Sequence, residues 1–281
     1  MRIESIRLKN FKVFKNLHLK DLPKLVIFVG ANGSGKSTLF DVFGFLSEAL
    51  KNNVKSAIFN RGGFKEVISR GCSGNIEIEI QFRLQIAGVE RLVTYILHIG
   101  ESKGLPFVER EILRYKRGSA GKPYHFIDFS KGEGYAITNE EDFNKADEEL
   151  TRETQKLGST DILAIKGLGQ FERFKAASAF RNFIENWHIS DFHVADARPS
   201  RDAGYTEHLS PTGDDLPLVA QFMMQNHPKI FDKVLRKMEK RVPGVSKVEA
   251  ETTQDGRVIL KFQDSGFKDP FIARFVSDGT I

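Results

Sequence analysis

Residues 25–38 read LVIFVGANGSGKST, and this stretch decides the fold class. Its first five residues form a continuous apolar run, which predicts a strand covered on both faces of a parallel sheet. The glycine-rich stretch from Gly30 to Ser37 fits the pattern G-x-x-x-x-G-K-[ST]. Apolar residues then recur at helical spacing, which predicts a helix from Thr38 to Leu50. A strand, a glycine-rich loop and a helix in this order predict an α/β fold of the P-loop class.

Each fixed residue of this loop has a physical role in binding phosphate. Glycines let the backbone curl so that successive N–H groups point at phosphate oxygens, at the positive end of the following helix. Lys36 would reach the β- and γ-phosphates of a nucleoside triphosphate, and the Ser37 hydroxyl would hold Mg²⁺. The predicted nucleotide-binding residues of the loop are Asn32, Gly33, Ser34, Gly35, Lys36, Ser37 and Thr38.

The sequence around the loop predicts a β-rich region followed by a helical one. Alternating apolar residues predict strands near 6–8, 17–19, 76–86, 93–99, 107–116 and 123–129. The charged stretch 139–156 predicts a solvated helix or a mobile excursion. Helices are predicted over 170–187 and over 216–241, with a break at Pro228. Asp255-Gly256 predicts a hairpin, and residues 271–276 predict one last strand.

The composition is that of a globular protein and excludes several kinds of site, but it does not indicate a function. The chain has 281 residues, a formal net charge of +5 and ordinary globular composition. Cys72 is the only cysteine, which rules out an intramolecular disulfide and a cysteine-cluster metal site within one chain. No apolar run approaches the roughly 20 residues that cross a membrane, and no signal peptide is visible. These features favour a cytoplasmic protein whose mild basicity permits nucleic-acid contact without requiring it.

Several landmarks together resemble the ATPase heads of ABC-type proteins, in particular the SMC/RecF/OLD-like predicted AAA ATPases of bacteria. The resemblance rests on residues 10–14 (NFKVF), on the glycine-rich loop, and on three later motifs in the right order. Those motifs are 213–216 (GDDL), 242–245 (VPGV) and 276–280 (VSDGT). The resemblance implies one ATPase head over 1–281, with an antiparallel β lobe and a helical lobe. Its parts would be a P-loop and β-rich lobe over 1–135, a helical lobe over 136–246, and residues 247–281 leading into the signature motif.

The resemblance also implies ATP as the nucleotide, with Mg²⁺, and adds two sets of binding residues. Lys12 would lie on a loop that touches the phosphates. Ser277, Asp278 and Gly279 would form the signature motif, which in this group binds the γ-phosphate of ATP held by the other protomer. A hydroxyl and free backbone N–H groups suit that role. The implied assembly is a homodimer of two heads that sandwich ATP, with a nuclease or another effector, or DNA, as candidate partners.

The chain departs from this group near its C-terminus. In the group, an apolar strand ending in Asp-Glu follows the signature motif and supplies the metal-binding and water-positioning carboxylates. This sequence reaches Ile281 without such a strand, and residues 258–264 (VILKFQD) offer one acid only. No catalytic residue is therefore identified, and the chain alone is expected to hydrolyse ATP poorly or not at all. The C-terminal part of the core sheet is expected to be missing, with an exposed apolar edge beside the loop, as in a fragment, a truncated product or the ordered part of something longer.

Three other patterns are weaker than the phosphate loop. Residues 144–147 (NKAD) match the guanine-reading motif of GTPases but lie in a polar stretch, so no guanine site is predicted. His188, Asp191, His193 and Asp196 form a partial metal pattern that is more typical of hydrogen-bonding surface groups. Basic residues between Lys229 and Lys240 are typical of the wet face of an amphipathic helix, with a DNA-facing surface as the alternative.

The leading functional hypothesis is a molecular switch in which ATP drives association of two heads and hydrolysis releases them. Such heads act in DNA-related processes or in defence against phage, which here rests on analogy alone. One alternative is an ATP-binding scaffold subunit that does not hydrolyse ATP. A P-loop kinase for a small molecule is less favoured, because its arginine-rich lid would have to come from Arg110, Arg114 and Arg117, which lie in strand-like sequence.

Overall fold

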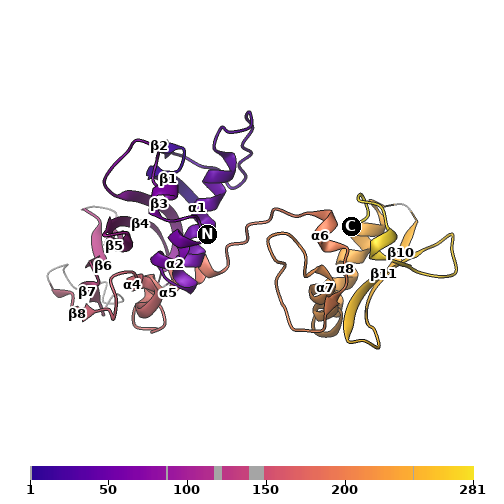
Figure 1. The fold of residues 1–281 in the computed structure, drawn as a ribbon. Helices are drawn as coiled ribbons and strands as arrows, with labels where there is room; N and C mark the ends of the chain where they lie inside the picture. The colour runs from indigo at the N-terminus through magenta and orange to yellow at the C-terminus, as the bar shows by residue number, and fades with distance from the viewer. Residues whose placement is uncertain (1, 87, 117–121, 139–148, 243) are drawn as a thin grey trace. The chain divides into compact units, whose positions relative to one another are not determined.

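The computed structural model describes residues 2–86, 88–116, 122–138, 149–242 and 244–281, which form a mixed α/β structure (Figure 1). The chain divides into two compact units, Met1–Trp187 and His188–Ile281, and each is described by itself. The division at Trp187 coincides with neither predicted lobe boundary, at 135/136 or at 246/247. That both units belong to one ATPase head stays a prediction.

The first unit is built on an antiparallel eight-stranded sheet with strand order β2-β1-β3-β4-β5-β6-β7-β8. Its strands are β1 (Arg2–Phe11), β2 (Phe14–Leu19), β3 (Ile76–Ile86), β4 (Val89–Ser102), β5 (Leu105–Tyr115), β6 (Tyr124–Ser130), β7 (Glu133–Ile137) and β8 (Arg152–Lys156). In β3, apolar residues face the core and alternate with half-exposed polar residues, as predicted from the sequence. The predicted strands of the β-rich region are thus confirmed.

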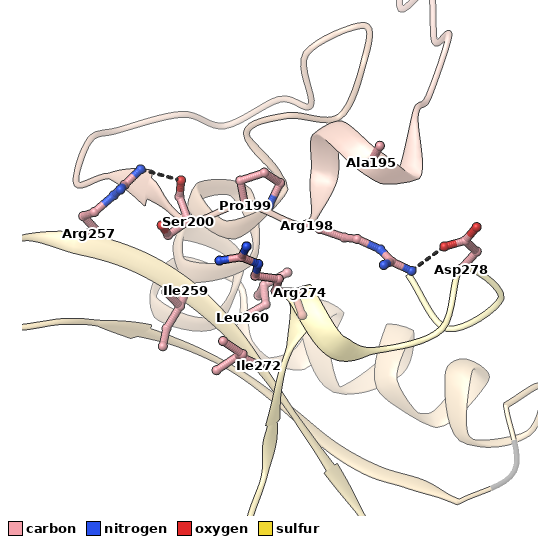
Figure 2. A pocket seen from close by; sticks show the side chains of 11 residues that line it. Ala195, Arg198, Pro199, Ser200, Arg257, Ile259, Leu260, Ile272, Arg274 and Asp278 are labelled. Atoms are coloured by element: carbon pink, nitrogen blue, oxygen red, sulfur yellow. Dashed lines mark hydrogen bonds and ion pairs between the residues drawn. The ribbon is translucent and has the colours of Figure 1, made fainter.

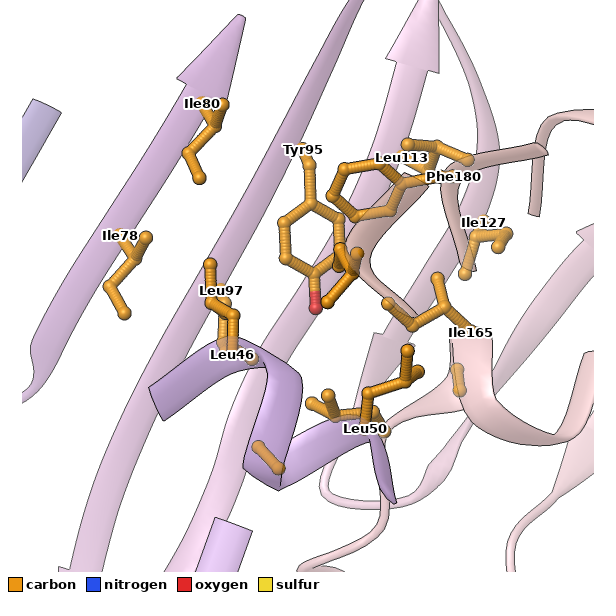
Figure 3. Close-up of a cluster of buried hydrophobic side chains, with 14 of the residues drawn as sticks. Leu46, Leu50, Ile78, Ile80, Tyr95, Leu97, Leu113, Ile127, Ile165 and Phe180 are labelled. Atoms are coloured by element: carbon orange, nitrogen blue, oxygen red, sulfur yellow. The ribbon is translucent and has the colours of Figure 1, made fainter. Parts of the chain in front are cut away.

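Helices pack on one face of this sheet and close the core. They are α1 (Lys36–Lys51), α2 (Val54–Phe59), α3 (Phe64–Val67), α4 (Ala164–Leu168) and α5 (Lys175–Glu185). Leu46 and Leu50 of α1 meet Tyr95 of β4 and Phe180 of α5 in the buried cluster shown in Figure 3. Burial of this apolar surface is the main force that holds α1, and hence the loop before it, on the sheet.

One buried carboxyl group joins the sheet to α4. Glu111 of β5 is fully buried and accepts hydrogen bonds from the N–H groups of Ala164 and Ile165, the latter at 3.2 Å, and from the Tyr95 hydroxyl at 3.1 Å. Burial raises the pKa of Glu111 to about 7, although these three hydrogen bonds act in the opposite direction. Glu111 is therefore a polar member of the core that satisfies the first N–H groups of α4.

The strand predicted at residues 25–29 does not form. The segment is irregular and belongs to no sheet, and Leu25, Ile27 and Val29 are 77%, 76% and 90% exposed. Phe28 points the other way, packs against the core, and meets Phe40 edge-on at a ring distance of 6.0 Å. The prediction was wrong because an apolar run becomes a buried strand only where neighbouring strands pair with it. No described segment pairs with this one, and the expectation that a part of the core sheet is missing beside the loop stays a prediction.

The second unit is a small sheet covered by two helices. It contains α6 (Val194–Ala197), β9 (Arg201–Asp202), α7 (Leu216–Asn226), α8 (Pro228–Glu239), β10 (Val245–Thr252), β11 (Arg257–Asp264), β12 (Phe271–Ile272) and the 3₁₀ helix η2 (Ala273–Phe275). Strand β11 is central and pairs with β10, β12 and β9. Phe231, Leu260 and Phe262 belong to its separate apolar core. The predicted hairpin at Asp255-Gly256 is confirmed.

The helical predictions are confirmed in part. The helix over 216–241 breaks before Pro228, as expected, because proline cannot donate the backbone hydrogen bond. On α8, however, only Phe231 of the predicted apolar face is buried, and Ile230 and Val234 are exposed. The helix predicted over 170–187 is the shorter α5.

Two further segments differ from expectation. The strand predicted over 271–276 is limited to β12, because the chain turns into η2 at Ala273. Residues 139–148, part of the predicted charged helix or excursion, and the NKAD motif at 144–147 lie outside the described residues, as does Arg117. The end of the charged stretch forms the edge strand β8, which pairs with β7. Among the residues that the structure describes, no helix is both long and apolar enough to cross a membrane.

Candidate functional site

The glycine-rich loop lies between the segment 25–29 and the first turn of α1. Gly33 and Gly35 adopt positive φ angles of 80° and 95°, and Gly35 is the N-cap residue of α1. A Cβ atom at Gly35 would lie 2.8 Å from the Phe14 ring and 2.9 Å from the Val13 side chain, so both the angle and the space require glycine there. The tip of the β1–β2 hairpin therefore fixes where the loop enters the helix.

The amino end of α1 has the chemistry of an anion site. No side chain caps Gly35, and the first turn carries no acidic residue, so the first N–H groups of the helix have no side-chain acceptor. The Lys36 ammonium turns back over the loop and donates to the carbonyl oxygens of Gly30 (2.7 Å) and Ala31 (2.8 Å). It also lies 3.4 Å from the Ser34 hydroxyl. A positive helix end, a lysine and a curled backbone thus meet at one place, as phosphate binding needs.

The remaining predicted loop residues are accessible. Asn32, Gly33, Ser34 and Ser37 are exposed, and Thr38 is half-buried. Their exposure at the start of α1 leaves the Ser37 hydroxyl free to meet a hydrated cation, a ligand chemistry that suits Mg²⁺.

Lys12 is held close to this helix by a carboxylate that sequence reasoning missed. Lys12 adopts a positive φ of 49° at the β1–β2 turn, and its N–H donates to the Val67 carbonyl at 2.6 Å. Its ammonium forms an ion pair of 2.5 Å with Asp41 of α1. The structure therefore places the Lys12 side chain on the helix that follows the phosphate loop.

Arg61 extends this group of charges. Its Nε donates to Asp41 at 3.0 Å, and its Nη1 donates to Glu48 at 2.6 Å and to the Ala57 carbonyl at 2.8 Å. Burial raises the pKa of Asp41, but the nearby cations Arg61 and Lys12 lower it by more, so it lies below its ordinary value. Asp41 and Glu48 are seven residues apart and share one face of α1. This spacing of two acids on a predicted helix is the only sequence feature that could have indicated the network around Arg61.

The predicted signature residues lie in the second unit, after η2. Residues 278–280 form a turn in which the Thr280 N–H donates to the Ser277 carbonyl at 3.0 Å. The Ser277 and Thr280 hydroxyls hydrogen-bond at 2.9 Å. Asp278 is 82% exposed and forms an ion pair with Arg198. The turn presents a hydroxyl and a carboxylate to solvent, and its role in binding a γ-phosphate stays a prediction.

The other candidate patterns have structural explanations. Asp264, the single acid at the end of β11, accepts a hydrogen bond from the Gly266 N–H at 2.8 Å and so fixes a turn. His193 and Asp191 form an exposed pair at 3.6 Å. Within the described parts of the chain, no three His, Cys, Asp or Glu side chains come together in a way that could hold a metal ion.

Comparisons with known proteins place this chain among ATPases. A family model described as AAA ATPase domain matches residues 1–192. The DNA replication and repair protein RecF of Idiomarina loihiensis is 35% identical over 74 residues, covering 26% of this chain and 19% of the relative. RecF of Lactococcus lactis subsp. cremoris (strain MG1363) is 26% identical over 146 residues, covering 49% of this chain and 40% of the relative. The chain thus spans less than half the length of the curated relatives it matches.

A solved structure is similar over a smaller part of the fold. It comes from work described as "Structural biochemistry of ATP-driven dimerization and DNA stimulated activation of SMC ATPases". It covers 44% of this chain and 72% of that chain, with 21% identity and a TM-score of 0.29, too low to define the fold. The family model, by contrast, covers well over half of the 281 residues, including Lys12 and the phosphate loop. The chain therefore belongs to the AAA ATPase domain family.

Proposed function

We propose that this chain binds ATP with Mg²⁺ at the loop before α1, and that the ATP-bound form associates with a second copy. The observation that carries the proposal is the Lys36 ammonium, folded over a glycine-rich loop at a helix end without a side-chain cap. Membership in the AAA ATPase domain family supports ATP as the nucleotide.

In this proposal, each residue of the loop has a stated task. The N–H groups of residues 33–36 and the α1 amino end bind phosphate oxygens, and Lys36 leaves the loop carbonyls to neutralise the β- and γ-phosphates. Mg²⁺ would be held by Ser37 and would offset phosphate charge. Lys12 adds a second cation, whose position is set by Asp41.

The association step rests on the resemblance of Ser277, Asp278 and Gly279 to a signature motif. We propose that these residues contact the γ-phosphate held by the other copy, and that association is the switch signal. DNA, or an effector such as a nuclease, is the proposed recipient of that signal in the cytoplasm, and antiviral defence is the proposed setting. RecF relatives are named for DNA replication and repair, which supports a DNA-related role.

Nucleotide binding and turnover by the full chain test the proposal together. We expect Lys36→Ala to abolish ATP binding, because the loop loses its cation. Lys51→Ala, at the other end of α1, removes the same charge and should leave binding unchanged. Binding is measured by calorimetry and turnover by phosphate release. Equal ATP affinity in the wild type and in Lys36→Ala would contradict the proposed site.

Turnover then separates the switch from the scaffold alternative. We propose that the chain alone turns ATP over slowly, because Asp264, the one acid at the end of β11, already serves as a turn acceptor. Binding without turnover would favour an ATP-binding scaffold subunit. Turnover that Lys36→Ala removes would place a catalytic carboxylate within these residues. Sedimentation with and without ATP, in the wild type and in Ser277→Ala, tests the association step.

A further inference from the structure

The second unit contains a pocket that lies apart from the glycine-rich loop and shares only Asp278 with the residues proposed to contact nucleotide. Its volume is about 660 Å³, within the range of small-molecule sites. It lies between the segment after α6 and the β11–β12 sheet, and Figure 2 shows three arginines around it. They are Arg198, Arg257 and Arg274.

The arginines come from three different elements and line the same pocket. Arg198 follows α6, Arg257 opens β11, and Arg274 lies in η2. In Figure 2 the Arg274 side chain lies between the other two, beneath Pro199 and Ser200. An anion in the pocket would therefore lie near more than one guanidinium group.

The anions present compensate them only in part. Arg198 pairs with Asp278, and Arg257 lies 3.5 Å from Asp202. Arg274 has no hydrogen-bond or ion-pair partner among the described residues. Three cations against two carboxylates leave one positive charge, and it is carried by the arginine between the other two.

Arg198 has a buried donor group without an acceptor among the residues that the structure describes. Its Nε is buried and has no hydrogen-bond partner in the described part of the chain, although its Nη2 pairs with Asp278. Buried donors in folded proteins are nearly always paired, so this one calls for an acceptor. Asp278 itself is 82% exposed, and an exposed pair of this kind contributes little to stability, so a stronger anion can replace it.

The floor of the pocket is apolar. Ile259 and Leu260 of β11 and Ile272 of β12 line it, and Ser200 adds a hydroxyl at the rim. Arginine forks bind phosphate in a bidentate manner, and an apolar floor favours a flat or aliphatic group attached to it.

We propose that this pocket binds a terminal phosphate monoester attached to an apolar or aromatic group, with Arg274 as the main phosphate contact. A free mononucleotide and the phosphorylated end of a nucleic-acid strand offer the same chemistry. The site differs from the phosphate loop and does not depend on ATP binding there. Because Asp278 shares Arg198 with the pocket, a bound phosphate also releases the 278–280 turn.

The test uses the full chain carrying Lys36→Ala, so that the phosphate loop contributes no binding. AMP and short oligothymidylates with and without a 5′-phosphate are titrated by calorimetry. We expect Arg274→Gln to weaken binding of the phosphorylated probe on the order of tenfold or more, because a charge-assisted hydrogen bond is lost. The affinity of Arg274→Lys for this probe should lie between those of the parent chain and Arg274→Gln, because lysine keeps the charge but cannot bind phosphate in a bidentate manner.

A matched control is Arg236→Gln, which removes an exposed arginine of α8 away from the pocket. It should leave the affinity unchanged. Binding of the phosphorylated oligonucleotide but not of AMP, with the same loss in Arg274→Gln, would identify nucleic acid as the source of the phosphate. The proposal is overturned if neither AMP nor the phosphorylated oligonucleotide binds, or if Arg274→Gln and Arg236→Gln weaken binding equally.

Discussion

Gly33 and Gly35 have similar backbone angles but different surroundings, which gives a test of the loop at the residue scale. No atom lies within 4 Å of a Cβ built at Gly33, whereas one at Gly35 meets Phe14 and Val13. We expect Gly33→Ala to cost about 1 kcal/mol from backbone strain alone. Gly35→Ala should cost more and should also weaken ATP binding, because the hairpin tip must move. Urea unfolding and calorimetry measure both effects, and equal losses in the two variants would contradict this geometry.

Glu111 gives the first unit a distinct dependence on pH. Its pKa is about 7 in the folded protein against 4.5 for an ordinary glutamate, so the folded state binds more protons between these values. The contribution of Glu111 to the free energy of unfolding should therefore be greatest below pH 4.5, and the free energy should fall by about 3 kcal/mol as the pH rises through 7. Glu111→Gln cannot ionise and should lose this slope.

The measurement is urea unfolding followed by fluorescence of Trp187, which packs against Phe43 and Phe183 at ring distances of 4.7 and 4.9 Å. Glu239→Gln, at the exposed end of α8, is the control and should keep the slope. A slope that survives in Glu111→Gln would assign the pH dependence to another group.

At the scale of elements, the segment 25–29 contains both exposed apolar side chains and one, Phe28, that packs against the core. Ile27→Ser should change the free energy of unfolding by no more than about 0.5 kcal/mol, because the side chain is already in water. Phe28→Ala should cost about 1–2 kcal/mol, since Phe28 packs against the core and Phe40. A large loss in Ile27→Ser would show that the segment is covered in solution.

An element can be predicted from the sequence when neighbouring residues determine it, and not when it depends on pairing with a distant segment. The alternation in β3 and the glycine-rich pattern that ends at Ser37 each depend on residues that are close in the sequence. The strand and the loop could therefore be predicted without the fold. Strand β8 reads RETQK and has no apolar pattern; it is a strand because β7 pairs with it. The residues 25–29 show the reverse, with strand-like sequence and no partner.

The candidate sites follow the same division. The loop residues lie together in the sequence, and their spacing alone was enough to predict them as a phosphate site. The Asp41–Arg61 contact joins residues 20 apart, and Arg198–Asp278 joins residues 80 apart, so no local pattern could indicate either pair. Long-range ion pairs of this kind depend on the tertiary fold rather than on residue spacing.

At the scale of the whole molecule, two separate apolar cores predict two separate unfolding transitions. One core lies within the first unit, and the other is built by α7, α8 and the β10–β12 sheet. Leu260→Ala should destabilise the second unit by about 2–4 kcal/mol, because a buried side chain of its core is removed. Circular dichroism should then show an earlier partial transition, while the Trp187 fluorescence transition stays in place.

Leu46→Ala is the complementary variant, because Leu46 is buried in the core of the first unit. It should shift the Trp187 transition and leave the other one unchanged. If Leu260→Ala moves the fluorescence transition by the same amount as Leu46→Ala, the two units unfold as one.

The strand order of the large sheet also predicts an order in which its parts fold. Strands β3 to β7 are neighbours both along the chain and in the sheet, so they can form as successive hairpins with little loss of loop entropy. Strand β1 pairs with β3 only after the long connection that carries the phosphate loop and α1 has closed. The glycine-rich loop should thus be among the last parts to become ordered, and pulsed hydrogen exchange should find amides of β4 protected before those of α1.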